Sequence, residues 1–111
     1  MGGRVELVPG TLDMMVMQAV VGENRHGFGI ARWIEDVTGD RLTVEEGALY
    51  PALHRLEKRG LLASEWGRTE RGRRARYYGL TEAGQAELEA LRRRWDESTW
   101  AVRQVLDSGA S

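Results

Sequence analysis

The chain has 111 residues, and its 16 basic and 17 acidic side chains leave a formal net charge of −1. Hydrophobic residues make up 41% of it and charged residues 30%, which is typical of one globular domain with room for an extra element and excludes a disordered or fibrous protein. The longest apolar run, residues 14–17, is too short to cross a membrane, no signal peptide is recognisable, and the absence of cysteine fits a reducing cytoplasm.

The first two helices are predicted from apolar stripes. Thr11 is expected to cap the first helix, with Asp13 in its first turn, where the helix dipole favours an anion. Its stripe consists of Leu12, Met15, Val16, Ala19 and Val20. A polar break at residues 22–27 precedes a second helix, which runs to about Thr38 and stops at Gly39. The inner face of this second helix is predicted to contain Ile30, Ala31, Ile34 and Val37.

A third helix is predicted to begin at Thr43, because Glu46 stands three residues later and completes a capping box. Its buried stripe is Leu49, Ala52, Leu53 and Leu56, and Gly60 ends it. Pro51 lies inside this pattern, where it removes one backbone hydrogen bond and should bend the helix.

The apolar period then changes to alternation. Residues 62–66 and 74–80 read as two strands of a hairpin joined by the turn-prone stretch 67–72. Thr81 caps a last helix that reaches about Leu106, roughly 38 Å long, too long to be buried by the domain before it. We predict a mainly helical α+β fold, with a winged helix-turn-helix at residues 1–80 and a dimerisation helix at residues 81–111.

Charge is distributed unevenly along the chain. Between His54 and Arg76, eight basic residues stand against three acidic ones, which leaves +5, whereas the remaining chain carries −6. This asymmetry indicates a local anion-binding surface on a nearly neutral protein. A solvated charged face is the alternative interpretation.

Two groups of residues are candidates for contact with double-stranded DNA. The outward face of the third helix, where Ala48 and Pro51 are small, offers Tyr50, His54, Arg55 and Lys58. The hairpin offers arginines, whose planar guanidinium groups bind phosphate with two hydrogen bonds: Arg68, Arg71, Arg73, Arg74 and Arg76. Arg71 and Arg73 flank Gly72 at the predicted tip, and alternation places Arg74 and Arg76 on one face. A merely solubilising hairpin is the alternative.

The last helix has a heptad pattern formed by Gly84, Leu88, Leu91, Trp95, Ser98, Val102 and Val105. Such a seam predicts lengthwise packing against a second helix, with only the first turn packed on its own domain. The expected homodimer interface contains Leu88, Leu91, Trp95, Val102 and Val105. Two-fold pairing would place the two reading helices about 34 Å apart.

Four stretches resemble the PadR family of bacterial transcriptional regulators, named for repression of phenolic-acid metabolism: PGTLDMMVMQAV at 9–20, HGFGIARWIE at 26–35, VEEGALYPALHRLEKRGLL at 44–62 and GRRARYYGLTEAG at 72–84. The second stretch departs from the family pattern at Phe28 and Trp33. The resemblance implies a homodimeric repressor on a palindromic operator, released by a small aromatic or drug-like effector. The single C-terminal helix resembles a smaller subgroup, some of whose members bind flat aromatic ligands between tryptophans at the dimer interface. Trp95 is where such a role would fall, with interface packing alone as the alternative.

Other classes of function find little support in the residues. The two histidines, His26 and His54, lie in different predicted elements, and neither a phosphate-binding loop motif nor a metal-ligand spacing is present. We therefore expect no catalytic residues, no metal, no cofactor and no membrane partner. The remaining rival is a winged helix used for protein–protein contact without DNA specificity.

Overall fold

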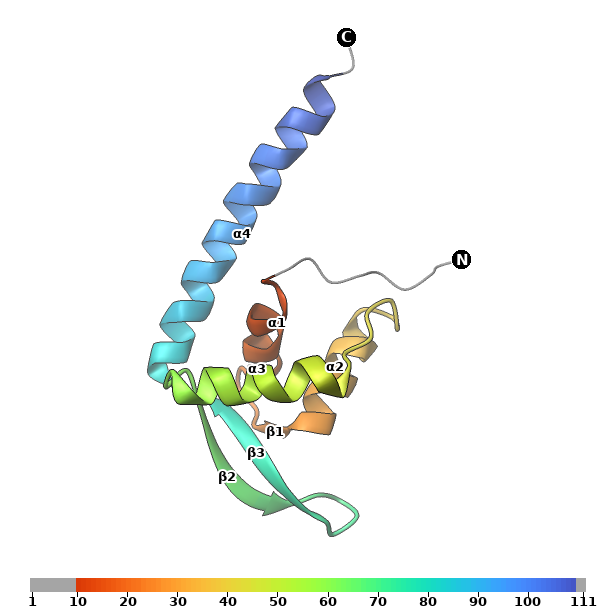
Figure 1. Cartoon of the computed structure of the whole chain (residues 1–111), viewed down its shortest axis with the longest axis vertical. Helices are drawn as coiled ribbons and strands as arrows, with labels where there is room; N and C mark the ends of the chain where they lie inside the picture. The colour runs from red at the N-terminus through yellow and green to blue at the C-terminus, as the bar shows by residue number, and fades with distance from the viewer. Residues whose placement is uncertain (1–9, 110–111) are drawn as a thin grey trace.

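The computed structural model describes residues 10–109, so the outer limits of the two predicted domains lie outside the described residues. The elements along the chain are α1 (Leu12–Ala19), β1 (Arg25–His26), α2 (Gly27–Val37), α3 (Glu46–Lys58), β2 (Leu62–Arg68), β3 (Arg74–Leu80) and α4 (Glu82–Ser108). Helices α1 to α3 form a compact head, the β2–β3 hairpin extends from it as a wing, and α4 runs away from the wing (Figure 1). This arrangement confirms the predicted mainly helical α+β winged helix-turn-helix.

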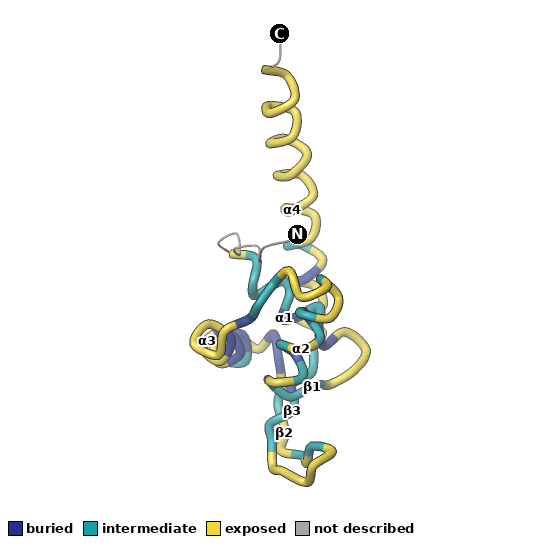
Figure 2. Tube along the Cα trace, turned by 90° about the vertical axis from the view of Figure 1, so that its right-hand side faces the viewer, coloured by how far each residue is buried: buried dark blue, intermediate teal, exposed yellow. Residues whose placement is uncertain are grey.

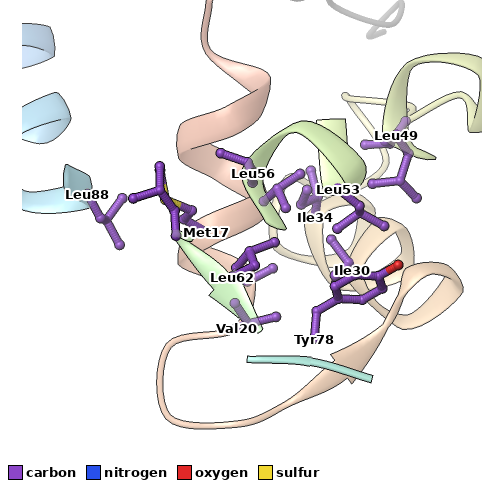
Figure 3. Packing of buried hydrophobic residues seen from close by; sticks show 14 residues of the cluster. Met17, Val20, Ile30, Ile34, Leu49, Leu53, Leu56, Leu62, Tyr78 and Leu88 are labelled. Carbon is purple, nitrogen blue, oxygen red and sulfur yellow. The ribbon is translucent and has the colours of Figure 1, made fainter. Parts of the chain in front are cut away.

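The core lies where the apolar stripes of the helices meet the base of the wing (Figure 3). Its largest fully buried side chains are Met17, Ile30, Ile34, Leu49, Leu53, Leu56, Leu62, Leu88, Val16 and Val20. Most of these positions belong to the predicted stripes, because a helix of period 3.6 turns one apolar face toward its neighbours. Leu12, Met15 and Ala31 are partly buried against the same cluster.

Two expectations for the helices were wrong. Helix α3 begins at Glu46 with Glu45 as N-cap, so the capping box from Thr43 does not form. The chain is held extended before α3 because the Val44 amide donates to Oε2 of Glu35 on α2 (3.3 Å) and the Val44 side chain is buried. Val37 is 59% exposed instead of buried, because the hydrophobic cluster follows α2 only as far as Ile34.

The sheet has a third strand that the sequence did not reveal. Its order is β1-β3-β2, with Arg25 opposite Tyr78 and His26 opposite Tyr77. His26 of this strand is also the N-cap of α2, because its Nδ1 atom accepts a hydrogen bond from the Gly29 amide (3.0 Å). The predicted polar break is therefore a structural joint between the wing and α2.

Helix α4 belongs to the domain only at its beginning. Thr81 caps it as predicted, by accepting from the Gly84 amide (2.9 Å). Leu88 is 2% exposed and lies in the core of its own chain, so the structure gives it a different place from the predicted dimer interface. Packing on the head continues to Leu91, beyond the first turn, and residues 92–109 are exposed (Figure 2). No described helix is long and apolar enough to span a membrane.

Candidate nucleic-acid interface

Helix α3 turns one face outward, across the front of the view in Figure 1. Pro51, His54 and Lys58 are exposed on it, and Tyr50 is 47% exposed at its edge. The Tyr50 ring rests against Gly27, where an added Cβ would come within 2.8 Å of the phenol oxygen. Gly27 at the start of α2 therefore makes room for Tyr50, and the junction between β1 and α2 helps to hold this outward face of α3 in place.

A groove of about 740 Å³ separates this face of α3 from the wing. It is lined by Tyr50, His54, Glu57, Lys58, Arg76 and Tyr78. Three of these are predicted DNA-contact residues of α3, and Arg76 is one of the wing. Burial of the Tyr78 phenol raises its pKa, and the nearby negative charge of Glu57 raises it further. Tyr78 therefore stays neutral at the floor of the groove.

Three polar side chains join α3 to the wing inside this groove. Oε2 of Glu57 accepts from Ser64 Oγ on β2 (2.6 Å) and from Arg76 Nη2 on β3 (3.4 Å), and Ser64 Oγ accepts from Arg76 Nε (3.0 Å). The hydrogen bond from Ser64 lowers the pKa of Glu57 below its ordinary value. The hydrogen bond and positive charge of Arg76 lower it further. Arg76 is therefore already neutralised within the protein.

Arginines further out along the wing are ordered by their neighbours. The guanidinium of Arg74 stacks on the Trp66 ring at 4.2 Å from its centre, and that of Arg76 at 5.2 Å. Arg74 and Arg76 thus share one face, as the alternation predicted. Arg68 donates to the Gly72 carbonyl across the turn (2.8 Å), which keeps its guanidinium beside the tip.

Arg71 and Arg73 differ from the other wing arginines in their contacts. Both are exposed in the turn between β2 and β3, and neither side chain forms an ion pair or hydrogen bond with any of residues 10–109. The turn itself is ordered: the Thr69 amide donates to the Arg73 carbonyl (2.8 Å), and Gly72 adopts a φ of 81° that favours glycine. Two free cations thus stand on a fixed support.

Arg55 lies apart from the groove. Its Nη2 atom is 2.6 Å from Oδ1 of Asp13 on α1, so its guanidinium points toward α1 and away from the wing. The structure therefore does not bring Arg55 together with Tyr50, His54 and Lys58. Sequence reasoning also missed Glu57, Ser64 and Trp66, although Ser64 and Trp66 alternate on the same face of β2 and supplied a signal.

A second groove, of about 330 Å³, lies between α1 and the beginning of α4. Its lining residues are Met14, Met15, Gln18, Leu88, Arg92, Trp95 and Asp96. Trp95 is thus set beside flexible, polarisable methionines at the point where α4 leaves the head. No group of three or more potential metal ligands occurs within residues 10–109.

Comparison with known proteins places this architecture. The chain is 52% identical over 63 residues to the transcriptional regulator Rv3488 of Mycobacterium tuberculosis, a match that covers 57% of this chain and 55% of that protein. A PadR family transcriptional regulator of Eggerthella lenta is 31% identical in sequence, with a TM-score of 0.76 over 87% of this chain and 82% of that one. A transcriptional regulator of Clostridium thermocellum, 24% identical, has the same fold, with a TM-score of 0.79 over 86% of this chain and 92% of that one.

The pattern of the transcriptional regulator PadR-like family matches residues 16–90, which contain α2, α3, the whole wing and the beginning of α4. This range includes both the outward face of α3 and the wing arginines, so the match covers the elements that form the groove. The chain therefore belongs to the PadR-like family and is a DNA-binding regulator of transcription, not an enzyme.

Proposed function

We propose that two copies of this chain bind a palindromic operator and repress transcription from it until a small aromatic effector releases them. The observation that carries the DNA-binding part is the groove, where the exposed face of α3 and the ordered wing lie on its two sides. A duplex seated on this surface would meet α3 in its major groove and the wing on its backbone.

The candidate residues then have different roles. Tyr50, His54 and Lys58 face the duplex from α3 and supply base or phosphate contacts. Arg71 and Arg73 grip phosphates without reading the sequence, and the lack of a hydrogen-bond or ion-pair partner for their side chains among residues 10–109 supports this role. Arg68 and Arg74 reinforce the positive potential beside the tip, while Arg55 joins only after leaving Asp13.

The exposed length of α4 supports a dimer. Val102 and Val105 of the heptad seam are 56% and 71% exposed, and Leu106 beside them is also exposed. A row of large apolar side chains in water is unfavourable, and lengthwise packing against a second α4 would cover it. The wing and the far end of α4 lie at opposite ends of the molecule (Figure 2). Contact between two α4 helices therefore leaves the groove open.

The groove between α1 and α4 supports the effector part. Its volume is at the lower end of the range for small-molecule sites, and Trp95 offers a flat aromatic surface beside Met14 and Met15. A ligand wedged there would alter how α4 leaves the head and so the spacing of two reading helices. A repressor of this kind acts in the cytoplasm, where the bacterial chromosome lies.

The decisive experiment is selection of bound sequences from random DNA, followed by anisotropy measurements of affinity against salt concentration. We expect two inverted half-sites, with centres about 10–10.5 base pairs apart, and an affinity that falls steeply with added salt. No enrichment together with a flat salt response would contradict the proposal and favour a wing used for protein–protein contact. Enrichment of a single half-site would contradict the dimer alone.

A further inference from the structure

One acidic side chain faces the groove that the proposed function assigns to DNA. Glu57 lies in the last turns of α3, between His54 and Lys58. A carboxylate near a phosphate backbone opposes binding, because like charges repel. Its presence there calls for a role other than contact with DNA.

The contacts of Glu57 supply that role. Its carboxylate reaches both long strands of the wing, through Ser64 on β2 (2.6 Å) and Arg76 on β3 (3.4 Å). Ser64 and Arg76 are also bonded to each other (3.0 Å), so the three side chains close a triangle. Two of these bonds tie α3 to the wing, one through each strand, and the third joins the two strands, so a rotation of the wing about its base would break more than one hydrogen bond.

The effect extends outward from the base of the wing. Arg76 stacks on Trp66, and Trp66 also carries Arg74 on its ring. A chain of contacts thus connects Glu57 through Arg76 and Trp66 to Arg74, next to the turn that contains Arg71 and Arg73. The pKa of Glu57 is lowered, first by the hydrogen bond from Ser64 and then by Arg76, as expected for a carboxylate held in its charged form by these contacts.

We infer that Glu57 is a positioning residue of the DNA interface, which sets the angle between α3 and the wing by binding Ser64 and Arg76. This inference rests on the proposed function. It assigns Arg76 to the support of the wing and not to contact with the DNA backbone. Arg71 and Arg73 remain the arginines that contact DNA phosphates.

The sign of a charge-removing substitution tests the inference. Glu57→Ala removes the triangle, and Glu65→Ala removes the same charge from an exposed residue whose partner across the sheet is Tyr77, on the opposite face of β2. If Glu57 positions the wing, Glu57→Ala weakens operator binding roughly tenfold, whereas Glu65→Ala leaves it equal or slightly tighter. Glu57→Gln keeps an acceptor for Ser64 and should fall between the two. Binding by Glu57→Ala as tight as by Glu65→Ala would overturn the inference.

A measurement without DNA separates this inference from the proposed function. Amide hydrogen exchange in β2 and β3 should become faster in Glu57→Ala and remain at the parental rate in Glu65→Ala. Unchanged exchange, or faster exchange with unchanged affinity, would each overturn the positioning role. Failure of the parent protein to bind any DNA would contradict the proposed function, while the exchange rates would still decide whether Glu57 holds the wing. Ser64→Ala, which removes the shared hydroxyl, replaces Glu57→Ala in both measurements if that variant does not fold.

Discussion

The guanidinium of Arg55 on α3 donates to the carboxylate of Asp13 on α1 across 2.6 Å, over 42 residues of sequence. The next two residues of α1, Met14 and Met15, line the groove that also contains Trp95. One ion pair thus connects the helix beside the proposed effector groove to a candidate DNA contact.

Replacing Asp13 by Asn tests whether this pair restrains Arg55. We expect DNA affinity to rise about threefold, because the change frees the Arg55 guanidinium from its partner and removes one negative charge from the protein. The free energy of unfolding should fall by no more than about 1 kcal/mol, since the Arg55 side chain is 55% exposed and solvent screens its attraction to Asp13, which is 25% exposed. Fluorescence anisotropy and thermal unfolding measure the two effects. Asp36→Asn, which breaks the exposed pair with Arg32 within α2, is the control, and weaker DNA binding by Asp13→Asn would show that the pair between Asp13 and Arg55 positions α3.

The free arginines at the wing tip are tested by the double substitution of Arg71 and Arg73 by Ala. Affinity should decrease to a similar degree for operator and random DNA, because phosphate contacts carry no sequence information. The slope of log affinity against log salt should shrink by about two, since each lost phosphate contact removes about 0.9. Alanine at Arg93 and Arg103, both exposed on α4, is the matched control. A double mutant that binds random DNA as well as the parent would disprove the backbone grip.

The seam on α4 is tested by Val102→Asp. A charge in a helix–helix interface is desolvated without a partner, so we expect the dimer dissociation constant to rise at least tenfold, or about 1.4 kcal/mol. Gln104→Asp places the same charge two residues along, on another side of the exposed helix. Sedimentation equilibrium should find Gln104→Asp dimeric and Val102→Asp shifted to monomer. Equal dissociation constants for the two variants would place the dimer interface elsewhere.

Local pattern was sufficient for the elements of this fold whose residues are close in sequence. Leu49, Leu53 and Leu56 form one stripe of α3 as expected, and Thr81 caps α4 with a hydrogen bond to its third residue. Such features depend on helical periodicity and on orphan amides at a helix end, both of which are visible in a short window.

Features that depend on distant partners escaped prediction. Strand β1 contains only Arg25 and His26, too short to alternate, and it exists because it pairs with β3 more than 50 residues later. Gly84 belongs to the predicted heptad seam of α4, yet an added Cβ there would collide with the carbonyl oxygen of Leu61 on its own chain. Its small size lets α4 pass close to the start of the wing, a constraint set by tertiary packing.

The same distinction applies to the site. Clustering of wing arginines along the sequence indicated an anion-binding surface, but it could not separate Arg71 and Arg73 from Arg76. The first two have no side-chain hydrogen bond or ion pair within the described part of the chain, whereas Arg76 is bound to Glu57. That separation requires the fold to bring α3 against β3. The predicted DNA contacts themselves stay predictions until binding is measured.

The role of Trp95 is tested by fluorescence titration with acridine, a flat tricyclic aromatic compound. Stacking on Trp95 in the groove between α1 and α4 should quench its emission with a saturable curve. Trp95→Ala should remove this component, whereas Trp100→Ala, on an exposed stretch of α4 outside that groove, should keep it. Equal quenching in the parent and in Trp95→Ala would leave Trp95 with packing alone.

The dependence of the free energy of unfolding on pH in the acid range tests the contacts of Glu57 with Ser64 and Arg76. The pKa of Glu57 is lower in the folded chain than its ordinary value of 4.5, because Ser64 and Arg76 bind the charged carboxylate. Its contribution to stability is therefore present above that value and is lost as the pH falls through the lower, folded pKa. Urea unfolding at a series of pH values below 4.5 should give a free energy that declines more steeply for the parent than for Glu57→Gln, which has no proton to bind there. Glu65→Gln, on the other face of β2 from Ser64, is the control for loss of one carboxylate from the wing. Parallel curves for the parent and Glu57→Gln would show that folding does not change the acidity of Glu57.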